Sequence, residues 1–163
     1  MIDKTWHKTC IINIFYKFYK MSELYKKNKK DQGYSVPKIL VIDDEKLIRW
    51  SLKEILVQEG YDVDTIDTAD EAINLAKDIP YHLIIADLEI QGDNGIETLK
   101  KIKEFRPEVT TIILSARPKS QIKPEFGDLE VYATIEKPFK SEQLLSIAKE
   151  ALDSAPITEE ETK

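Results

Sequence analysis

The chain has 163 residues, enough for one domain of ordinary size with short extensions. Its formal net charge of -6 disfavours direct nucleic-acid binding. A single cysteine, Cys10, excludes an internal disulfide. No apolar run approaches the roughly 20 residues that a membrane-spanning helix needs, so we expect a cytoplasmic protein.

The first strand is predicted at Lys38–Ile42, a continuous aliphatic run typical of a strand covered on both faces. Apolar residues at helical spacing then predict a helix over Glu45–Glu59. A second strand is expected at Tyr61–Ile66. Thr68 is a candidate N-cap for the next helix, which must end before Pro80.

The second half of the chain continues this alternation. Tyr81–Ala86 is a third apolar strand, and apolar residues share one face of a helix over Gly95–Phe105. Val109–Leu114 and Tyr132–Ile135 are the fourth and fifth strands, and Ser141 is expected to cap the last helix. The repeated strand–helix order predicts one parallel sheet with helices on both faces.

One stretch does not fit the alternation. Residues Arg117–Glu130 should contain the fourth helix, but they include Pro118, Pro124 and Gly127. Pro118 could start a helix, whereas Pro124 would break its interior. We expect a short or distorted element there.

Polar residues follow four of the predicted strands, namely Asp43 with Asp44, Asp87, Ser115 and Lys137. The carboxyl ends of parallel strands meet at one edge of the sheet, where ligands bind in open α/β folds. Carboxylates brought within about 4 Å of each other repel by roughly 4 kcal/mol at an effective dielectric near 20, so they shift their pKa values or bind a cation. Oxygen ligands suit Mg²⁺. The pattern therefore predicts a metal next to a phosphoryl site.

Taken singly, each of these residues is more simply explained as a turn or a strand end. Their joint placement favours a functional site. His82 has no partner at metal-ligand spacing and is interpreted as structural. Trp50 is interpreted as a packing or surface residue.

Four motifs resemble those of response-regulator receiver domains of two-component systems. They are Lys38–Glu45 (KILVIDDE), Asp87, Leu114–Ala116 (LSA) and Glu136–Phe139 (EKPF), and Asp93–Gly95 (DNG) resembles the turn after the family's acceptor. The resemblance covers residues 37–153. It implies a flavodoxin-like, doubly wound α/β fold with five parallel strands in the order 2-1-3-4-5, like that of the chemotaxis regulators.

The resemblance also implies roles for individual residues. Asp87 would accept a phosphoryl group from a phosphohistidine of a sensor histidine kinase or phosphotransfer protein. Mg²⁺ would be held by Asp43, Asp44, Asp87 and the backbone carbonyl of Glu89, with Asp43 binding directly or through water.

Two further residues would contact the phosphoryl group. Lys137 would pair with a phosphoryl oxygen, and the Ser115 hydroxyl would turn inward to hydrogen-bond it. The chain would then be a signalling switch that assists its own phosphorylation and dephosphorylation, not an enzyme with a separate substrate. Its downstream protein partner is unknown.

Two positions depart from the family pattern. Gln91 stands where proline is usual, and Thr134 stands where an aromatic switch residue is usual. Tyr132 would share a strand face with Thr134 but is displaced along the strand. These departures concern the output surface, whereas the phosphorylation chemistry is intact.

Two other functions compete with the switch. A pseudo-receiver would keep the fold as an interaction module without accepting phosphate. A phosphohydrolase using Asp87 as nucleophile would need a nearby acid or base, and Glu89 replaces the aspartate expected two residues later, so this hypothesis is the weakest.

The ends of the chain are expected to lie outside the domain. Residues 1–36 carry eight lysines and three acidic residues, and residues 154–163 form an acidic tail. Ile11, Ile14, Phe15 and Phe18 share one helical face, which is typical of a helix that lies on a membrane surface or docks on a partner. The alternative, a natural start at Met21, is favoured. The chain is interpreted as a stand-alone receiver or a truncated transcriptional regulator, since Leu47–Glu54 is similar to receivers of enhancer-binding activators.

Overall fold

The computed structural model describes residue 20 and residues 36–90 and 92–154. Several predictions concern residues outside this described part of the chain. They are the N-terminal helix, the alternative start at Met21, the substitution at Gln91 and nearly all of the acidic tail. Within the described residues, no helix is both long and apolar enough to cross a membrane.

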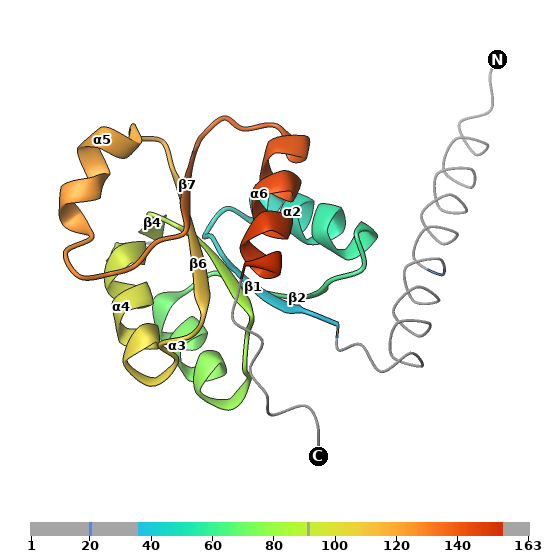
Figure 1. The fold of residues 1–163 in the computed structure, drawn as a ribbon, viewed down its shortest axis with the longest axis horizontal. Coiled ribbons are helices and arrows are strands. Elements are labelled where there is room, and N and C mark those ends of the chain that lie inside the picture. Colours follow the sequence, from blue (N-terminus) through green and yellow to red (C-terminus); the bar gives the residue numbers. More distant parts are fainter. Residues whose placement is uncertain (1–19, 21–35, 91, 155–163) are drawn as a thin grey trace.

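The core of the described chain is a parallel sheet of five strands (Figure 1). The strands are β1 (Lys38–Ile42), β2 (Asp62–Ile66), β3 (Leu83–Asp87), β6 (Thr110–Ser115) and β7 (Ala133–Glu136). Their order in the sheet is β2-β1-β3-β6-β7, and every neighbouring pair is parallel. This order is the predicted 2-1-3-4-5, so the flavodoxin-like fold is confirmed.

Helices cover both faces of the sheet (Figure 1). One face packs against α2 (Lys46–Gln58) and α6 (Ser141–Asp153). The other face packs against α3 (Ala69–Asp78), α4 (Gly95–Phe105) and α5 (Lys119–Ile122). The central strands β1 and β3 are apolar along nearly their whole length because both of their faces are buried under helices, whereas the edge strand β2 carries Asp62 and Asp64.

The central strands supply both layers of the core in alternation. In β1, Leu40 and Ile42 belong to the layer under α3 and α4, while Ile39 and Val41 belong to the layer under α2 and α6. All four are fully buried. This two-residue period turns the continuous aliphatic run into two separate cores.

The region with the two prolines is distorted, as predicted. α5 has a single turn, and a 3-10 helix, η1 (Lys123–Glu125), continues from it. Pro118 is the N-cap of α5, and Pro124 lies at the start of η1. There its missing N–H and fixed φ are tolerated, which explains why the α-helix stops before it.

Two expected helix caps differ in detail. Ser141 is the first residue of α6, and the N-cap is Lys140, so the prediction that Ser141 caps this helix is wrong. Thr68 is the N-cap of α3, but its side chain makes no capping hydrogen bond. Residue type alone could not distinguish a cap from the first helical turn, because cap residues are also tolerated there.

A short antiparallel pair that the sequence did not predict follows β3. It joins β4 (Glu89–Ile90) to β5 (Asp93–Asn94), and Gly92 between them has φ 84°. The chain then enters α4 through Gly95, where a Cβ atom would collide with the carbonyl oxygen of Asp87. Glycine is therefore required for this close approach of α4 to the end of β3.

Candidate functional site

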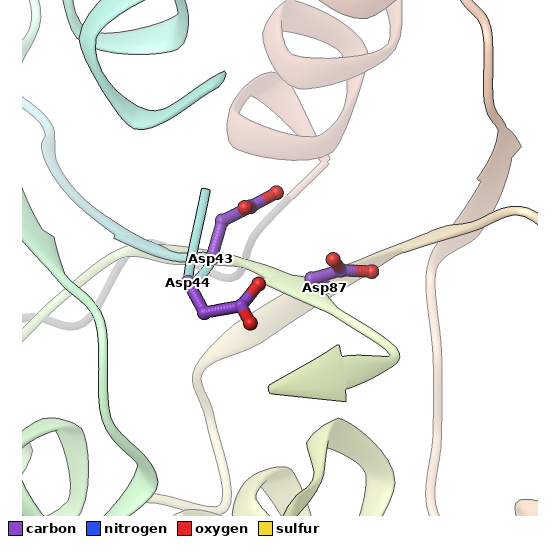
Figure 2. Close-up of side chains that lie close together, drawn as sticks. All are labelled: Asp43, Asp44 and Asp87. Carbon is purple, nitrogen blue, oxygen red and sulfur yellow. The ribbon is translucent and has the colours of Figure 1, made fainter. Parts of the chain in front are cut away.

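Three aspartates converge at the carboxyl edge of the sheet (Figure 2). Asp43 and Asp44 directly follow β1, and Asp87 is the last residue of β3. The parallel register pairs Ile42 with Ala86, so the residues that follow on the two strands emerge side by side. The structure therefore brings the three aspartates together at this edge, as the sequence predicted.

The three carboxylates are close enough to share one ligand. Each offers an oxygen within 4.8 Å of an oxygen of the other two. Asp43 is fully buried and Asp87 is only 7% exposed, whereas Asp44 lies partly open to solvent. The cluster thus has a buried floor and an accessible side.

An open cavity of about 430 Å³ lies over this cluster. Its lining residues are Asp44, Glu45, Asp87, Leu88, Glu89, Gly92, Ala116 and Lys137. The cavity is large enough for a phosphoryl group and several waters. It opens at the edge of the sheet where α/β folds bind ligands.

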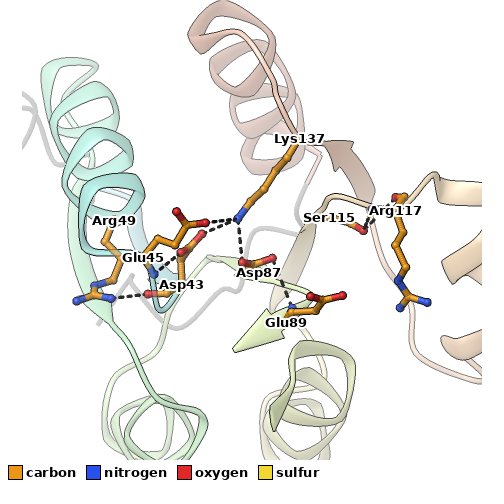
Figure 3. Close-up of polar contacts among 8 residues, drawn as sticks. All are labelled: Asp43, Glu45, Arg49, Asp87, Glu89, Ser115, Arg117 and Lys137. Carbon is orange, nitrogen blue, oxygen red and sulfur yellow. Dashed lines mark hydrogen bonds and ion pairs between the residues drawn. The ribbon is translucent and has the colours of Figure 1, made fainter. Parts of the chain in front are cut away.

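Lys137 joins two of the carboxylates (Figure 3). Its Nζ atom lies 2.8 Å from Asp87 Oδ2 and 3.0 Å from Asp43 Oδ2, and 4.0 Å from Glu45 Oε1. Burial lowers the pKa of Lys137, but the hydrogen bonds to Asp87 and Asp43 outweigh it, so its pKa is raised and the ammonium stays charged. The residue follows β7, in a loop with a cis Lys137–Pro138 peptide.

Asp43 is held by three donors. Its Oδ1 atom accepts the backbone N–H of Glu45 at 2.8 Å, and Lys137 donates to its Oδ2. Its backbone carbonyl accepts from Arg49 at 2.6 Å. Burial raises the pKa of the Asp43 carboxyl, and the hydrogen bonds from Lys137 and Glu45 oppose that rise.

Arg49 is a site-supporting residue that the sequence analysis missed. It donates to the Asp43 carbonyl and, at 3.1 Å, to Asp67 after β2. It therefore ties the two loops that follow β1 and β2. Its sequence signal was weak, because an arginine on an amphipathic helix is more often a solvated surface residue.

Glu89, whose backbone carbonyl the family resemblance gives as a metal ligand, is the first residue of β4. It lines the cavity, and its backbone N–H faces Asp87 Oδ1 at 3.5 Å, the outer limit of a hydrogen bond. Its side chain is exposed. The contact between Glu89 and the acidic cluster is thus made by its backbone N–H.

Ser115 differs from the other predicted site residues in the direction of its side chain. Like Asp43, it is fully buried and does not line the cavity. Its hydroxyl accepts the Arg117 N–H at 2.9 Å and donates to the Arg117 carbonyl at 3.0 Å. Figure 3 shows the hydroxyl pointing toward Arg117, on the side away from Asp87. Ser115 ends β6, as expected, and without a phosphoryl group its hydroxyl is bound to Arg117 and turned away from Asp87.

The residues present fit a hard divalent cation. Three carboxylates within reach of one another supply oxygen ligands, and the open side of the cluster leaves room for water. Mg²⁺ prefers this donor set and keeps several waters when bound. The fold and the pocket together define a doubly wound α/β protein with an acidic ligand site at its carboxyl edge.

The family model of the response regulator receiver domain matches residues 39–149. The chain therefore belongs to this family, the receiver domains of two-component response regulators. The match spans the sheet, the helices on both of its faces and all of the site residues. A phosphoacceptor role and Mg²⁺ binding are standard features of the family.

Among curated proteins, the chain is 30% identical to the DNA-binding transcriptional regulator NtrC of Azospirillum brasilense, over 74% of this chain and 25% of that protein. It is 33% identical to the transcriptional regulatory protein ResD of Bacillus subtilis, over 74% of this chain and 50% of that protein. The chain thus spans between a quarter and a half of these relatives.

Solved structures of receiver domains are also similar to this chain. A CheY-like receiver domain from Methanospirillum hungatei is 30% identical with a TM-score of 0.69, covering 73% of this chain and 95% of that one. The response regulator TrrA of Thermotoga maritima, solved with Mg²⁺ and BeF, is 31% identical with a TM-score of 0.64, covering 71% and 99%. The neighbours are therefore covered almost completely.

Proposed function

We propose that Asp87 is the phosphoacceptor of a phosphorylation-dependent switch. The observation that carries this proposal is the position of Lys137, whose ammonium bridges Asp87 and Asp43 at the base of an open acidic cavity. A partly buried cation bound to an aspartate that lines the cavity suits a group that must carry additional negative charge after reaction. The proposal concerns this chain's own residues, within a family where such a switch is standard.

The metal would be held by Asp43, Asp44 and Asp87, with the backbone carbonyl of Glu89 as a fourth protein ligand. Three carboxylates within 4.8 Å of one another support this assignment. When bound, Mg²⁺ would supply positive charge that neutralises the carboxylates and the phosphoryl oxygens. Arg49 supports the same cluster by fixing the main chain at Asp43.

The transfer reaction is an in-line displacement at phosphorus. An ionised Asp87 oxygen forms the new P–O bond while the P–N bond of a donor phosphohistidine breaks, and the electron pair returns to the imidazole nitrogen. Lys137 stays protonated throughout and pairs with the negative charge that develops on the phosphoryl oxygens. Its ion pair with Asp87 keeps that carboxylate oriented before the reaction.

Ser115 would act after the transfer. Its hydroxyl lies at the end of β6, next to β3, so rotation about its side chain would direct it toward a phosphoryl group on Asp87. In the unphosphorylated chain the hydroxyl is bound to Arg117 instead. This change of partner would carry the state of Asp87 into the loop after β6.

The phosphoryl donor would be a sensor histidine kinase or a phosphotransfer protein, and the output a changed interaction with a protein partner. The switch unit would comprise residues 37–153, with 1–36 and 154–163 as extensions. It would assist its own phosphorylation and dephosphorylation without turning over a separate substrate. In the same proposal the protein is located in the cytoplasm and does not contact nucleic acid directly.

Intact-mass measurement after incubation with acetyl phosphate and Mg²⁺ tests the acceptor. The wild type should gain one phosphoryl group, and Asp87→Asn should gain none. Asp93→Asn is the matched control, because Asp93 is an exposed aspartate on the adjacent β5. It should be phosphorylated like the wild type.

Three outcomes would contradict the proposal. Phosphorylation of Asp87→Asn would assign the acceptor to another residue. A wild type that gains no mass, from acetyl phosphate or from a phosphohistidine donor, would favour the pseudo-receiver hypothesis. Multiple turnovers of added phosphomonoesters would favour the phosphohydrolase.

A further inference from the structure

The hydroxyl of Ser115 is fully engaged by one neighbouring residue. It accepts the backbone N–H of Arg117 and donates its proton to the backbone carbonyl of Arg117. A serine hydroxyl has a single proton to donate. Ser115 therefore cannot donate to a phosphoryl oxygen unless its side chain rotates and breaks the hydrogen bond to the Arg117 carbonyl. Contacts that hold Arg117 in its present position stabilise this hydrogen bond and so oppose the rotation.

The side chain of Arg117 is fixed by a second contact, on the neighbouring helical segment. Its two terminal nitrogens donate to the two carboxylate oxygens of Glu125, at 2.8 and 3.1 Å. This two-pronged geometry is the favoured one for an arginine–carboxylate pair. Glu125 ends η1, so the pair ties the loop after β6 to the distorted segment that replaces a full helix.

The remaining polar atom of the Arg117 side chain gives no alternative anchor. Among the described residues its Nε atom is buried and has no hydrogen-bond partner. Glu125 is thus the residue whose hydrogen bonds fix the direction of the guanidinium.

We propose that Arg117 is a positioning residue for Ser115, and that the Arg117–Glu125 ion pair is a latch that holds the Ser115 hydroxyl turned away from Asp87. The inference rests on the proposed function, in which Ser115 turns to the phosphoryl group. Weakening the latch lowers the cost of that rotation. The chain then binds a phosphoryl group, or an analogue of it, more tightly, because the competent arrangement is already more populated.

Titration with beryllofluoride in the presence of Mg²⁺ tests the latch, because beryllofluoride is a phosphoryl analogue. Glu125→Gln removes the ionic partner and keeps the size of the side chain. Exposed ion pairs have modest energies, so the affinity should rise about two- to fivefold. Glu125→Lys, which replaces attraction by repulsion, should shift the affinity further in the same direction.

Glu97→Gln is the matched control. Glu97 forms a 2.8 Å ion pair with Lys100 on α4, and its substitution removes the same charge without touching Arg117. Its beryllofluoride affinity should equal that of the wild type. A rise of the same size in this variant would attribute the effect to net charge and overturn the latch.

Hydrogen exchange of the Arg117 amide gives a readout without any ligand. This N–H is bound to Ser115 Oγ, so Glu125→Gln should exchange it faster, by about the same two- to fivefold factor. Unchanged exchange and unchanged beryllofluoride affinity in Glu125→Gln would refute the latch. If the wild type itself does not bind beryllofluoride with Mg²⁺, the proposed function fails instead.

Discussion

Lys137 and Asp87 are 50 positions apart in the chain, and their side chains are joined by a hydrogen bond of 2.8 Å. The same Nζ atom contacts Asp43 at 3.0 Å, so one ammonium compensates two carboxylates. Both acids are almost completely buried. The charge balance of the pocket therefore depends on a lysine from the last strand–helix connection.

Removal of this ammonium should destabilise the fold. Lys137→Met leaves Asp43 and Asp87 buried beside each other without their cation, so the free energy of unfolding should fall by about 1–3 kcal/mol in metal-free buffer. Added Mg²⁺ should stabilise this variant more than the wild type, because it replaces the missing charge. Urea unfolding with and without Mg²⁺ measures both effects.

Lys140→Met is the control for this experiment. Lys140 is the exposed N-cap of α6, and its side chain makes no capping hydrogen bond. Its unfolding should match that of the wild type at both Mg²⁺ concentrations. Equal stability of Lys137→Met and Lys140→Met would show that Lys137 does not neutralise the cluster.

The close approach at Gly95 leads to a second expectation. Gly95→Ala would push α4 away from the Asp87 carbonyl, and such overpacking costs about 1–3 kcal/mol in unfolding free energy. Gly92→Ala meets no atom within 4 Å and adds only the strain of its φ of 84°, about 1–2 kcal/mol.

The two glycine variants should differ more in their rate of phosphorylation than in their free energy of unfolding. Gly95→Ala displaces the main chain of the proposed acceptor, so its phosphorylation by acetyl phosphate should slow at least tenfold, on the order of the loss expected for an acceptor misplaced by about 1 Å. Gly92→Ala should stay within about threefold of the wild type. A Gly95→Ala rate equal to that of Gly92→Ala would contradict the packing argument.

Sequence patterns predicted the positions of the acidic site because two strong signals coincide. Buried parallel strands are continuous aliphatic runs, and their carboxyl ends share one edge of the sheet. Asp44, Asp87 and Lys137 stand one or two residues after such runs, so their meeting needs no knowledge of side-chain packing. The order of the strands came from the family resemblance and agrees with the structure.

The features that the sequence did not predict depend on single side-chain directions. The direction of the Ser115 hydroxyl, away from Asp87, is set by its two bonds to Arg117. Arg49 joins two loops by contacting Asp43 after β1 and Asp67 after β2. The β4–β5 pair has only two residues in each strand, too short for any periodic signal. Such contacts are decided by tertiary packing and not by local residue preference.

Two helices begin at residues whose side chains can cap, but only one of these side chains makes the capping hydrogen bond. The Asn94 side chain accepts the N–H of Ile96 at 2.8 Å at the start of α4, whereas Thr68 caps α3 without such a bond. Asn94→Ala should therefore lower the free energy of unfolding by about 0.5–2 kcal/mol. Thr68→Ala should cost clearly less. Urea unfolding of both variants measures the difference, and equal losses would rule out the hydrogen bond as the cause.

At the amino-terminal edge of the sheet, two buried or paired groups lead us to expect a lower free energy of unfolding at alkaline pH. Tyr81 donates its hydroxyl to Asp64 at 2.7 Å, and Lys38 donates to Asp62 at 2.7 Å. Burial, together with the bond to Asp64, raises the pKa of Tyr81 above its usual 10.0. The hydrogen bond to Asp62 raises the pKa of Lys38 above its usual 10.5, although burial opposes this.

Both shifts mean that the folded chain holds protons that the unfolded chain releases above about pH 10. The contribution of these two groups to the unfolding free energy should therefore be constant below pH 10 and fall as the pH rises beyond it. Tyr81→Phe removes one of the two groups and should make this fall shallower, whereas Tyr132→Phe, at a 43% exposed position, should leave it unchanged. Urea unfolding between pH 8 and about 11 measures the slopes. A Tyr81→Phe slope as steep as that of the wild type would mean that the Tyr81 hydroxyl ionises equally easily in both states, and that its bond to Asp64 does not stabilise this edge.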